Sequence, residues 1–191
     1  TSLQSGKNDE ANRLADEALT MYPQNYAAHA LKAQYFNVNG NYDQAIQAIQ
    51  EALKSSPNHP AYLHILASAY HQKSRQPGLL PEQRDTLINQ ALNLYLIVAK
   101  HDPYNADLYF KIGHIFESID QPSDAIDAYN NAILVDPYKS PEPFSKLATI
   151  YSNLGFINEA FLTAKAGLSY HPEHFDLTLT AAQSEFSLKR Y

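Results

Sequence analysis

Small residues recur at regular positions along the chain and indicate contacts between helices. In one type of segment a small residue is followed three positions later by an aromatic residue. This combination occurs four times, as Ala33 and Phe36, Ala67 and Tyr70, Gly113 and Phe116, and Ala148 and Tyr151. In the segments that follow, small residues seven positions apart precede a proline, as Ala125 and Ala132 precede Pro137. Because residues at such spacings share one face of an α-helix, the pattern predicts an all-α chain in which helices pack in pairs.

Prolines set the period of this pattern. Pro23 and Pro57 are 34 residues apart, as are Pro103 and Pro137, and Pro172 follows 35 residues later. The interval from Pro57 to Pro103 is 46 residues, one period plus 12 residues. A proline inside a helix removes a backbone hydrogen bond and clashes with the preceding turn, so each of these prolines is expected to end a helix. The period predicts stacked repeats rather than an ordinary helical bundle.

The register gives the expected bounds of each helix. Gly40 and Gly155 mark turns inside two of the pairs, and Gly6 marks the equivalent turn in the earliest copy. The pattern predicts about four full helix pairs and half a repeat at each end. The full pairs are expected near residues 26–56, 60–102, 106–136 and 141–171, with lone helices near 8–22 and 174–189.

The 12 additional residues, 76–87, lie between the two helices of the second full pair. Pro77 and Gly78 are typical of a turn, and Pro81 followed by Glu82 is typical of a helix start. Two interpretations remain open: a lengthened helix with a capping turn, or a docking element that contacts a partner. In either case Leu79 and Leu80 are expected to be buried.

These features resemble the tetratricopeptide repeat, whose signature is W-x2-L-G-x2-Y…A-x3-F…P. The third pair matches it at Tyr109, Ile112, Gly113, Phe116, Ala125, Tyr129, Ala132 and Pro137. The resemblance covers essentially the whole chain and implies one α-α superhelix, a solenoid domain over residues 1–191. Two departures stand out: the tryptophan column holds His29, Leu63, Tyr109 and Phe144, and Lys32 replaces an expected leucine.

The amino-acid composition disfavours several kinds of partner and of protein. The chain is 45% hydrophobic and 18% charged, as is usual for a soluble protein, and its net charge is −6. That charge disfavours nucleic acid and anionic lipid as partners. No apolar run reaches the roughly 18 residues of a membrane span. The absence of cysteine excludes disulfides and fits the cytosol and the periplasm equally, so the compartment stays open. Because the chain begins with Thr1, we expect it to be a fragment or a processed product.

The sequence contains no recognisable catalytic constellation. It has no phosphate-binding loop, no nucleophile elbow and no dinucleotide glycine pattern, and it contains six glycines in total. His64 and His71 are two helical turns apart, about 10 Å, which is too far for both to bind one zinc ion easily. The sequence therefore predicts a protein that is not an enzyme and needs neither metal nor cofactor.

In tetratricopeptide proteins the first helices of the pairs line the concave face. The resemblance therefore implies a partner-binding groove formed by Gln34, Asn37, His64, Ser68, His71, Phe110, His114, Glu117, Thr149 and Asn153. These positions include almost no lysine or arginine, which disfavours the clamp that binds the carboxylate tails of chaperones. Phe110 is the preferred anchor for a ligand, because it has no evident folding role; burial between adjacent first helices is the alternative.

The leading hypothesis is a protein-interaction scaffold that binds a peptide or a protein partner in the groove. The alternative is a regulatory or substrate-positioning appendage of a larger bacterial envelope protein. The polar, cysteine-free repeats are similar in style to arrays in pilus assembly and glycan transfer. A third hypothesis is self-association through the uncapped ends, because a solenoid usually needs a polar face at each end.

Overall fold

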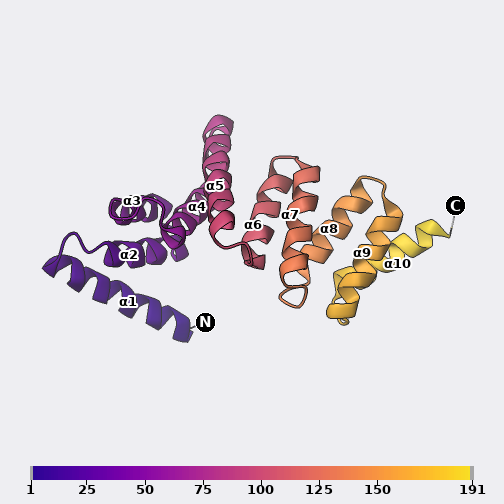
Figure 1. Cartoon of the computed structure of the whole chain (residues 1–191), viewed down its shortest axis with the longest axis horizontal. Helices are drawn as coiled ribbons and strands as arrows, with labels where there is room; N and C mark the ends of the chain where they lie inside the picture. The colour runs from indigo at the N-terminus through magenta and orange to yellow at the C-terminus, as the bar shows by residue number, and fades with distance from the viewer. Residues whose placement is uncertain (1, 190–191) are drawn as a thin grey trace. The chain divides into compact units, whose positions relative to one another are not determined.

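The computed structural model describes residues 2–189 of the chain, and its side chains from Asn8 onward. These residues form ten α-helices and no strand, so the all-α prediction is confirmed (Figure 1). None of the described helices combines the length and the apolar character that a bilayer span requires. The helices are α1 (Ser2–Met21), α2 (Tyr26–Val38), α3 (Tyr42–Leu53), α4 (Pro60–Ser74), α5 (Pro81–His101), α6 (Ala106–Ser118), α7 (Pro122–Val135), α8 (Glu142–Asn153), α9 (Ile157–Tyr170) and α10 (Phe175–Leu188).

Contacts divide the chain into two compact units, one ending at His101 and one beginning at Asp102. The first unit contains α1 to α5 and the second contains α6 to α10. One solenoid domain over residues 1–191 stays a prediction. The turn expected at Gly6 is wrong, because α1 begins at Ser2 and runs through this glycine. A single glycine costs a helix only about 1 kcal/mol, which a helix of 20 residues tolerates.

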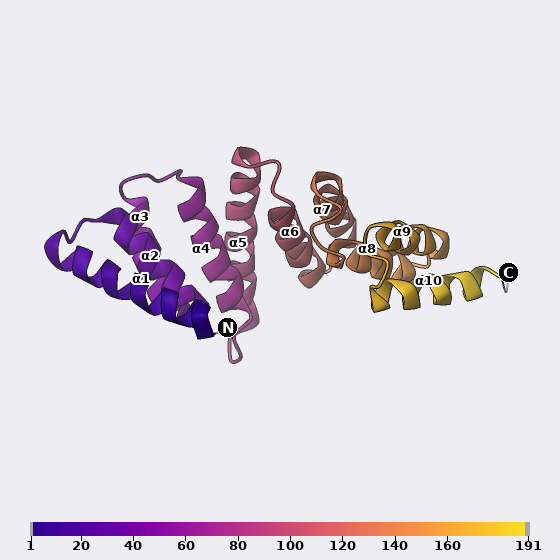
Figure 2. The ribbon, with the colours of Figure 1, turned by 90° about the horizontal axis from the view of Figure 1, so that it is seen from below.

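The first unit is held together by small residues at its helix contacts. Ala33, Ala45 and Ala67 are fully buried and let α2, α3 and α4 approach closely. Ile49 fills the space between these helices, in a core cluster with Ala30, Ala52, Ile65 and Leu66. Figure 2 shows α1 to α4 side by side.

Lys32, the residue that replaces a leucine of the repeat signature, does not leave a gap in the first unit. Its Nζ lies 5.2 Å from the centre of the Phe36 ring and pairs with Asp16 of α1. A lysine thus covers the apolar surface with its alkyl stem while its charge is neutralised. The α1–α2 contact is therefore polar at its edge.

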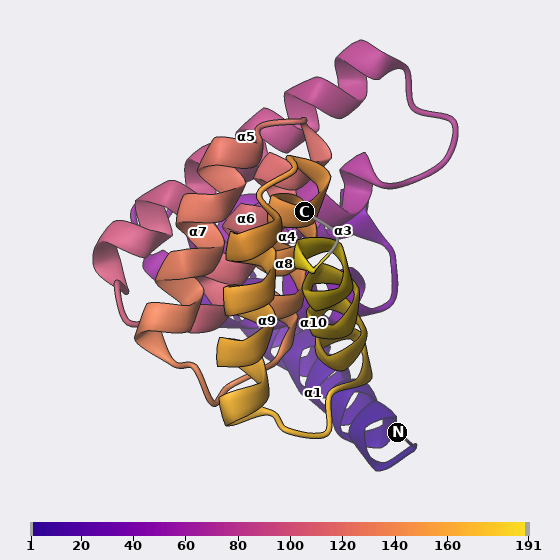
Figure 3. The same cartoon turned by 90° about the vertical axis from the view of Figure 1, so that its right-hand side faces the viewer.

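The second unit is packed around two aromatic side chains, Tyr129 of α7 and Phe144 of α8. Figure 3 shows α9 and α10, the last two helices of this unit, side by side. Tyr129 is fully buried, and a Cβ atom added to Gly113 of α6 would lie 2.6 Å from its Cε1 atom. A Cβ atom on Gly167 of α9 would lie 2.8 Å from the Cβ of Phe144. Both glycines are therefore required by close approach, as the small-residue pattern indicates.

The additional residues of the second pair form a turn and the beginning of α5. Gly78 has φ +87°, a left-handed conformation that favours glycine, and the backbone N–H of Leu80 donates to Gln83 Oε1 at 3.2 Å. Residues 81–86 are all exposed, so the first turns of α5 extend beyond their neighbours in the unit. The structure thus shows a lengthened helix with a capping turn. The expected burial of Leu80 is wrong, because it is 64% exposed.

Candidate functional site

The residues predicted to form the groove lie in both units, and each unit is considered by itself. Those of the first unit lie on α2 and α4, and those of the second on α6 and α8. The first group is Gln34, Asn37, His64, Ser68 and His71; the second is Phe110, His114, Glu117, Thr149 and Asn153.

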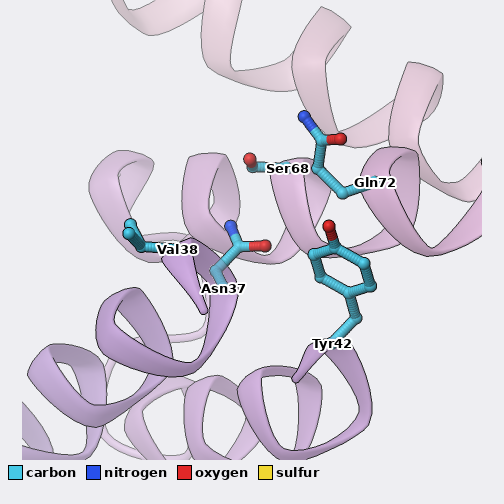
Figure 4. A pocket seen from close by; sticks show the side chains of 5 residues that line it. All are labelled: Asn37, Val38, Tyr42, Ser68 and Gln72. Atoms are coloured by element: carbon cyan, nitrogen blue, oxygen red, sulfur yellow. The ribbon is translucent and has the colours of Figure 1, made fainter. Parts of the chain in front are cut away.

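The first unit contains a pocket of about 350 Å³ between α2, α3 and α4 (Figure 4). Asn37 and Ser68, both predicted, line it together with Val38, Tyr42 and Gln72, which the sequence reasoning missed. Gln72 adjoins the predicted position His71 by one residue on α4. Tyr42 is the first residue of α3, a second helix, and second helices were not expected to reach the groove.

The pocket, referred to below as the α2–α4 pocket, is uncharged and rich in hydrogen-bonding groups. The amide of Asn37 is directed toward Ser68 and Tyr42, and the Tyr42 hydroxyl toward Gln72 (Figure 4). The Oδ1 atom of Asn37 is buried and accepts no hydrogen bond within the part of the chain that the structure describes. A buried carbonyl oxygen without a donor costs about 1–3 kcal/mol. Rotation of the Asn37 side chain would turn this oxygen toward the pocket, where it can accept a hydrogen bond.

The two predicted histidines of the first unit, His64 and His71, pack against the fold instead of lining an open groove. His71 is only 8% exposed and so lies within the fold rather than on an open surface. The His64 ring lies edge-on to Tyr95 of α5, with ring centres 5.5 Å apart. Gln34 is exposed on α2. Among the described residues no group of three or more His, Cys, Asp or Glu side chains is arranged to hold a metal ion.

Tyr95 gives the first unit a pH-dependent stability. Burial raises the pKa of its phenol from 10.0 to about 12, and a hydrogen bond with Ser68 partly offsets this. The stabilising contribution is therefore complete below about pH 10 and is lost as the pH rises to about 12. We expect the free energy of unfolding to fall by roughly 3 kcal/mol over this range because of Tyr95.

Urea unfolding at about pH 8, 10 and 12 measures this loss. The Tyr95→Phe variant is the control, because it cannot ionise and should show a shallower decline. Equal alkaline declines in the two proteins would contradict the assignment to Tyr95.

In the second unit Glu117 joins three helices. Its carboxylate accepts a hydrogen bond from the Tyr129 hydroxyl at 2.8 Å and pairs with Lys146 Nζ of α8 at 3.0 Å. Burial and the nearby Glu117 carboxylate raise the pKa of Tyr129. Glu117 thus has a structural role in addition to the partner-binding role predicted for it.

Phe110 also contributes to packing in the second unit. Its ring is half-buried, lies 5.7 Å from that of Tyr129 and lines a small cavity of about 30 Å³. Phe110 therefore has a folding role that the sequence did not indicate, whereas its role as an anchor for a ligand stays a prediction. His114 is half-buried next to Phe110, with ring centres 6.5 Å apart, whereas Thr149 and Asn153 are exposed on α8.

Family models agree with the arrangement of paired helices and small contact residues. Models described as tetratricopeptide repeat match residues 2–60, 38–77 and 106–139. The chain belongs to the tetratricopeptide repeat family.

A curated relative comes from Mycosarcoma maydis, the small glutamine-rich tetratricopeptide repeat-containing protein 2. It is 29% identical over 113 residues, which cover 56% of this chain and 29% of the relative. The chain therefore spans less than a third of the length of this relative.

Solved structures share the fold. TTC0263 from Thermus thermophilus is 23% identical with a TM-score of 0.66, over 96% of this chain and 93% of that one. MamA from Desulfovibrio magneticus RS-1 is 17% identical with a TM-score of 0.74, over 90% of each chain. YrrB, described as a TPR protein with an unusual peptide-binding site, is 15% identical with a TM-score of 0.70, over 92% of this chain and 84% of that one.

Proposed function

We propose that the chain is a protein-interaction scaffold and that the α2–α4 pocket binds an extended segment of a partner through its backbone. The observation that carries this proposal is the buried Oδ1 atom of Asn37, which accepts no hydrogen bond from the described residues. An extended peptide offers N–H groups at regular intervals, and one of them would satisfy this oxygen. YrrB, a protein of the same fold, is described as having a peptide-binding site, which supports the same class of function.

The lining of the α2–α4 pocket also indicates what kind of segment fits. Ser68, Tyr42 and Gln72 each carry groups that donate and accept hydrogen bonds, and none carries a charge. Val38 is 72% exposed and offers an apolar contact at the edge. Such a site suits a neutral polar segment with one small apolar side chain. A charged terminus would lose its hydration without gaining an opposite charge from these residues.

Affinity measurements on selected peptides test this proposal. Peptides are selected from a displayed random library on the wild-type chain, and their Kd is measured by calorimetry. We expect Asn37→Ala to weaken binding by about 0.5–1.5 kcal/mol, roughly two- to tenfold in Kd, because one hydrogen bond is lost.

Asn89→Ala is the matched control, because Asn89 is an exposed asparagine on α5 of the same unit. Its Kd should stay at the wild-type value. Selected peptides that bind all three proteins equally, or a library that yields no binder, would contradict the proposed site.

A further inference from the structure

The loop after α7 and the end of α9 bring two exposed aromatic rings together in the second unit. Tyr138 lies in the loop between α7 and α8 and is 73% exposed, and Tyr170 ends α9 and is 37% exposed. Their rings meet edge to face, with centres 4.9 Å apart and an angle of 88° between the planes. We name this surface the Tyr138–Tyr170 patch.

Contacts with neighbouring residues hold the two rings of the patch in place. Tyr170 stacks on Phe144, which is 2% exposed, with ring centres 5.7 Å apart. His171 fixes one loop to the other, since its Nε2 lies 2.9 Å from the backbone carbonyl oxygen of Pro137. The backbone N–H of Tyr138 donates to Asp136 Oδ1 at 3.1 Å, which fixes the turn that carries this ring. An aromatic surface that is already ordered loses little conformational entropy when it binds a partner.

The segments that carry or adjoin the two rings are acidic at neutral pH. Residues 136–142 and 171–176 contain four carboxylates, one lysine and two histidines, His171 and His174. The carboxylates, Asp136, Glu142, Glu173 and Asp176, are all exposed. The lysine, Lys139, is already paired with Asp107 of α6 at 3.2 Å. The charge of the patch is therefore complementary to a positively charged partner.

The same chain shows how an aromatic ring and a carboxylate together accommodate a cation. In the first unit Lys32 Nζ lies over the Phe36 ring while it pairs with Asp16. At the patch, a largely exposed tyrosine ring and a neighbouring carboxylate offer the same combination to a cation from outside. Tyrosine suits such an exposed position better than phenylalanine does, because its face attracts the cation while its hydroxyl bonds to water at the rim.

We infer that the Tyr138–Tyr170 patch is a second docking surface, separate from the α2–α4 pocket, for a partner segment that carries arginine or lysine. The cationic side chain stacks on Tyr138 and the carboxylates of the adjoining segments neutralise it. The two surfaces differ in the chemistry that they select: the pocket takes a neutral polar segment, and the patch takes a basic one.

A pair of short peptides tests this inference on the full chain. The probes are blocked Gly-Arg-Gly-Arg-Gly and the same peptide with citrulline in place of arginine, which keeps the shape and removes the charge. Their Kd values are measured by NMR titration. We expect the arginine peptide to bind more tightly than the citrulline peptide and to shift the amide signals of residues 136–142 and 170–174.

Tyrosine variants then locate the contact. Tyr138→Ala should raise the Kd of the arginine peptide by roughly two- to fivefold, the effect of one exposed cation–π contact, and Tyr138→Phe should retain the wild-type Kd. Tyr104→Ala is the matched control, because Tyr104 belongs to the same Asp-Pro-Tyr tripeptide one repeat earlier and is 86% exposed.

Each outcome decides the inference. Equal binding of the two peptides, no binding of either, or equal losses in Tyr138→Ala and Tyr104→Ala would overturn it. Asn37→Ala should leave the Kd of the arginine peptide unchanged; a loss in that variant would place the peptide in the α2–α4 pocket. Failure of the patch thus leaves the proposed function of the pocket standing, and failure of the pocket leaves the patch standing.

Discussion

Replacing Tyr129 with alanine is expected to lower the free energy of unfolding of the second unit by about 3–5 kcal/mol. The side chain is fully buried, and its ring fills the space that Gly113 leaves open on α6. Alanine would leave a cavity beside Gly113 that the helices cannot close without moving. The change would also remove the hydrogen bond that the phenol donates to Glu117.

Tyr129→Phe separates the two contributions. It keeps the ring and removes only the hydroxyl, so we expect a loss of about 1 kcal/mol, since Glu117 retains Lys146 and contact with water. Urea unfolding combined with hydrogen exchange, which localises the effect to α6, α7 and α8, provides the measurement. If the alanine variant were as stable as the phenylalanine variant, the ring would not be a central packing element.

Replacing Leu177 with alanine is expected to cost about 2–5 kcal/mol and to release α10. Leu177 is fully buried in a cluster with Phe144, Ala148, Ala164 and Ala181. The helix α10 packs against α9 and α8, so this leucine is its main apolar attachment. In an array of repeats each element contacts only its neighbours, and a terminal helix can therefore unfold separately.

Hydrogen exchange measures this release directly. The amides of α10 should exchange faster in Leu177→Ala while those of α6 and α7 keep their protection. Leu179→Ala is the matched control, because Leu179 lies on the same helix and is 44% exposed. A uniform loss of protection throughout the second unit would show that the unit unfolds as a whole and would contradict this expectation.

The packing of the helices could be predicted because two helices approach closely only where one of them carries a small residue. Ala33, Ala67, Gly113 and Ala148 are all buried, and each marks a place where a first helix is closely approached. Small residues are easy to recognise in a sequence, and they recur here at equivalent positions of a 34-residue repeat. Gly6 shows the limit of this reasoning, because a glycine that ends one helix can be tolerated inside another.

The candidate site was predicted only in part. Asn37 and Ser68 were found because the register places them on the faces of α2 and α4. Val38, Tyr42 and Gln72 were missed because the pocket forms where the end of one helix meets the start of the next. Side-chain directions at such a junction depend on the turn geometry, which the helical period does not contain.

His71 and Phe110 are more enclosed than an open groove position would be, and their partner-binding role stays a prediction. Both occupy positions that the register assigns to the groove, and the histidine lies almost wholly within the fold while the phenylalanine packs on Tyr129. The repeat signature describes an average pair of helices. How far a long side chain folds back over its own helix pair depends on the neighbours that it meets, and these differ from one pair to the next.

The most direct test of peptide binding in the α2–α4 pocket is to map a bound peptide onto the first unit. The wild-type chain is labelled for NMR and titrated with a neutral peptide selected from the displayed library. We expect the largest changes at the side-chain amides of Asn37 and Gln72 and at the backbone of Tyr42 and Ser68. Changes confined to other surfaces, with these four residues unaffected at saturation, would contradict binding in this pocket.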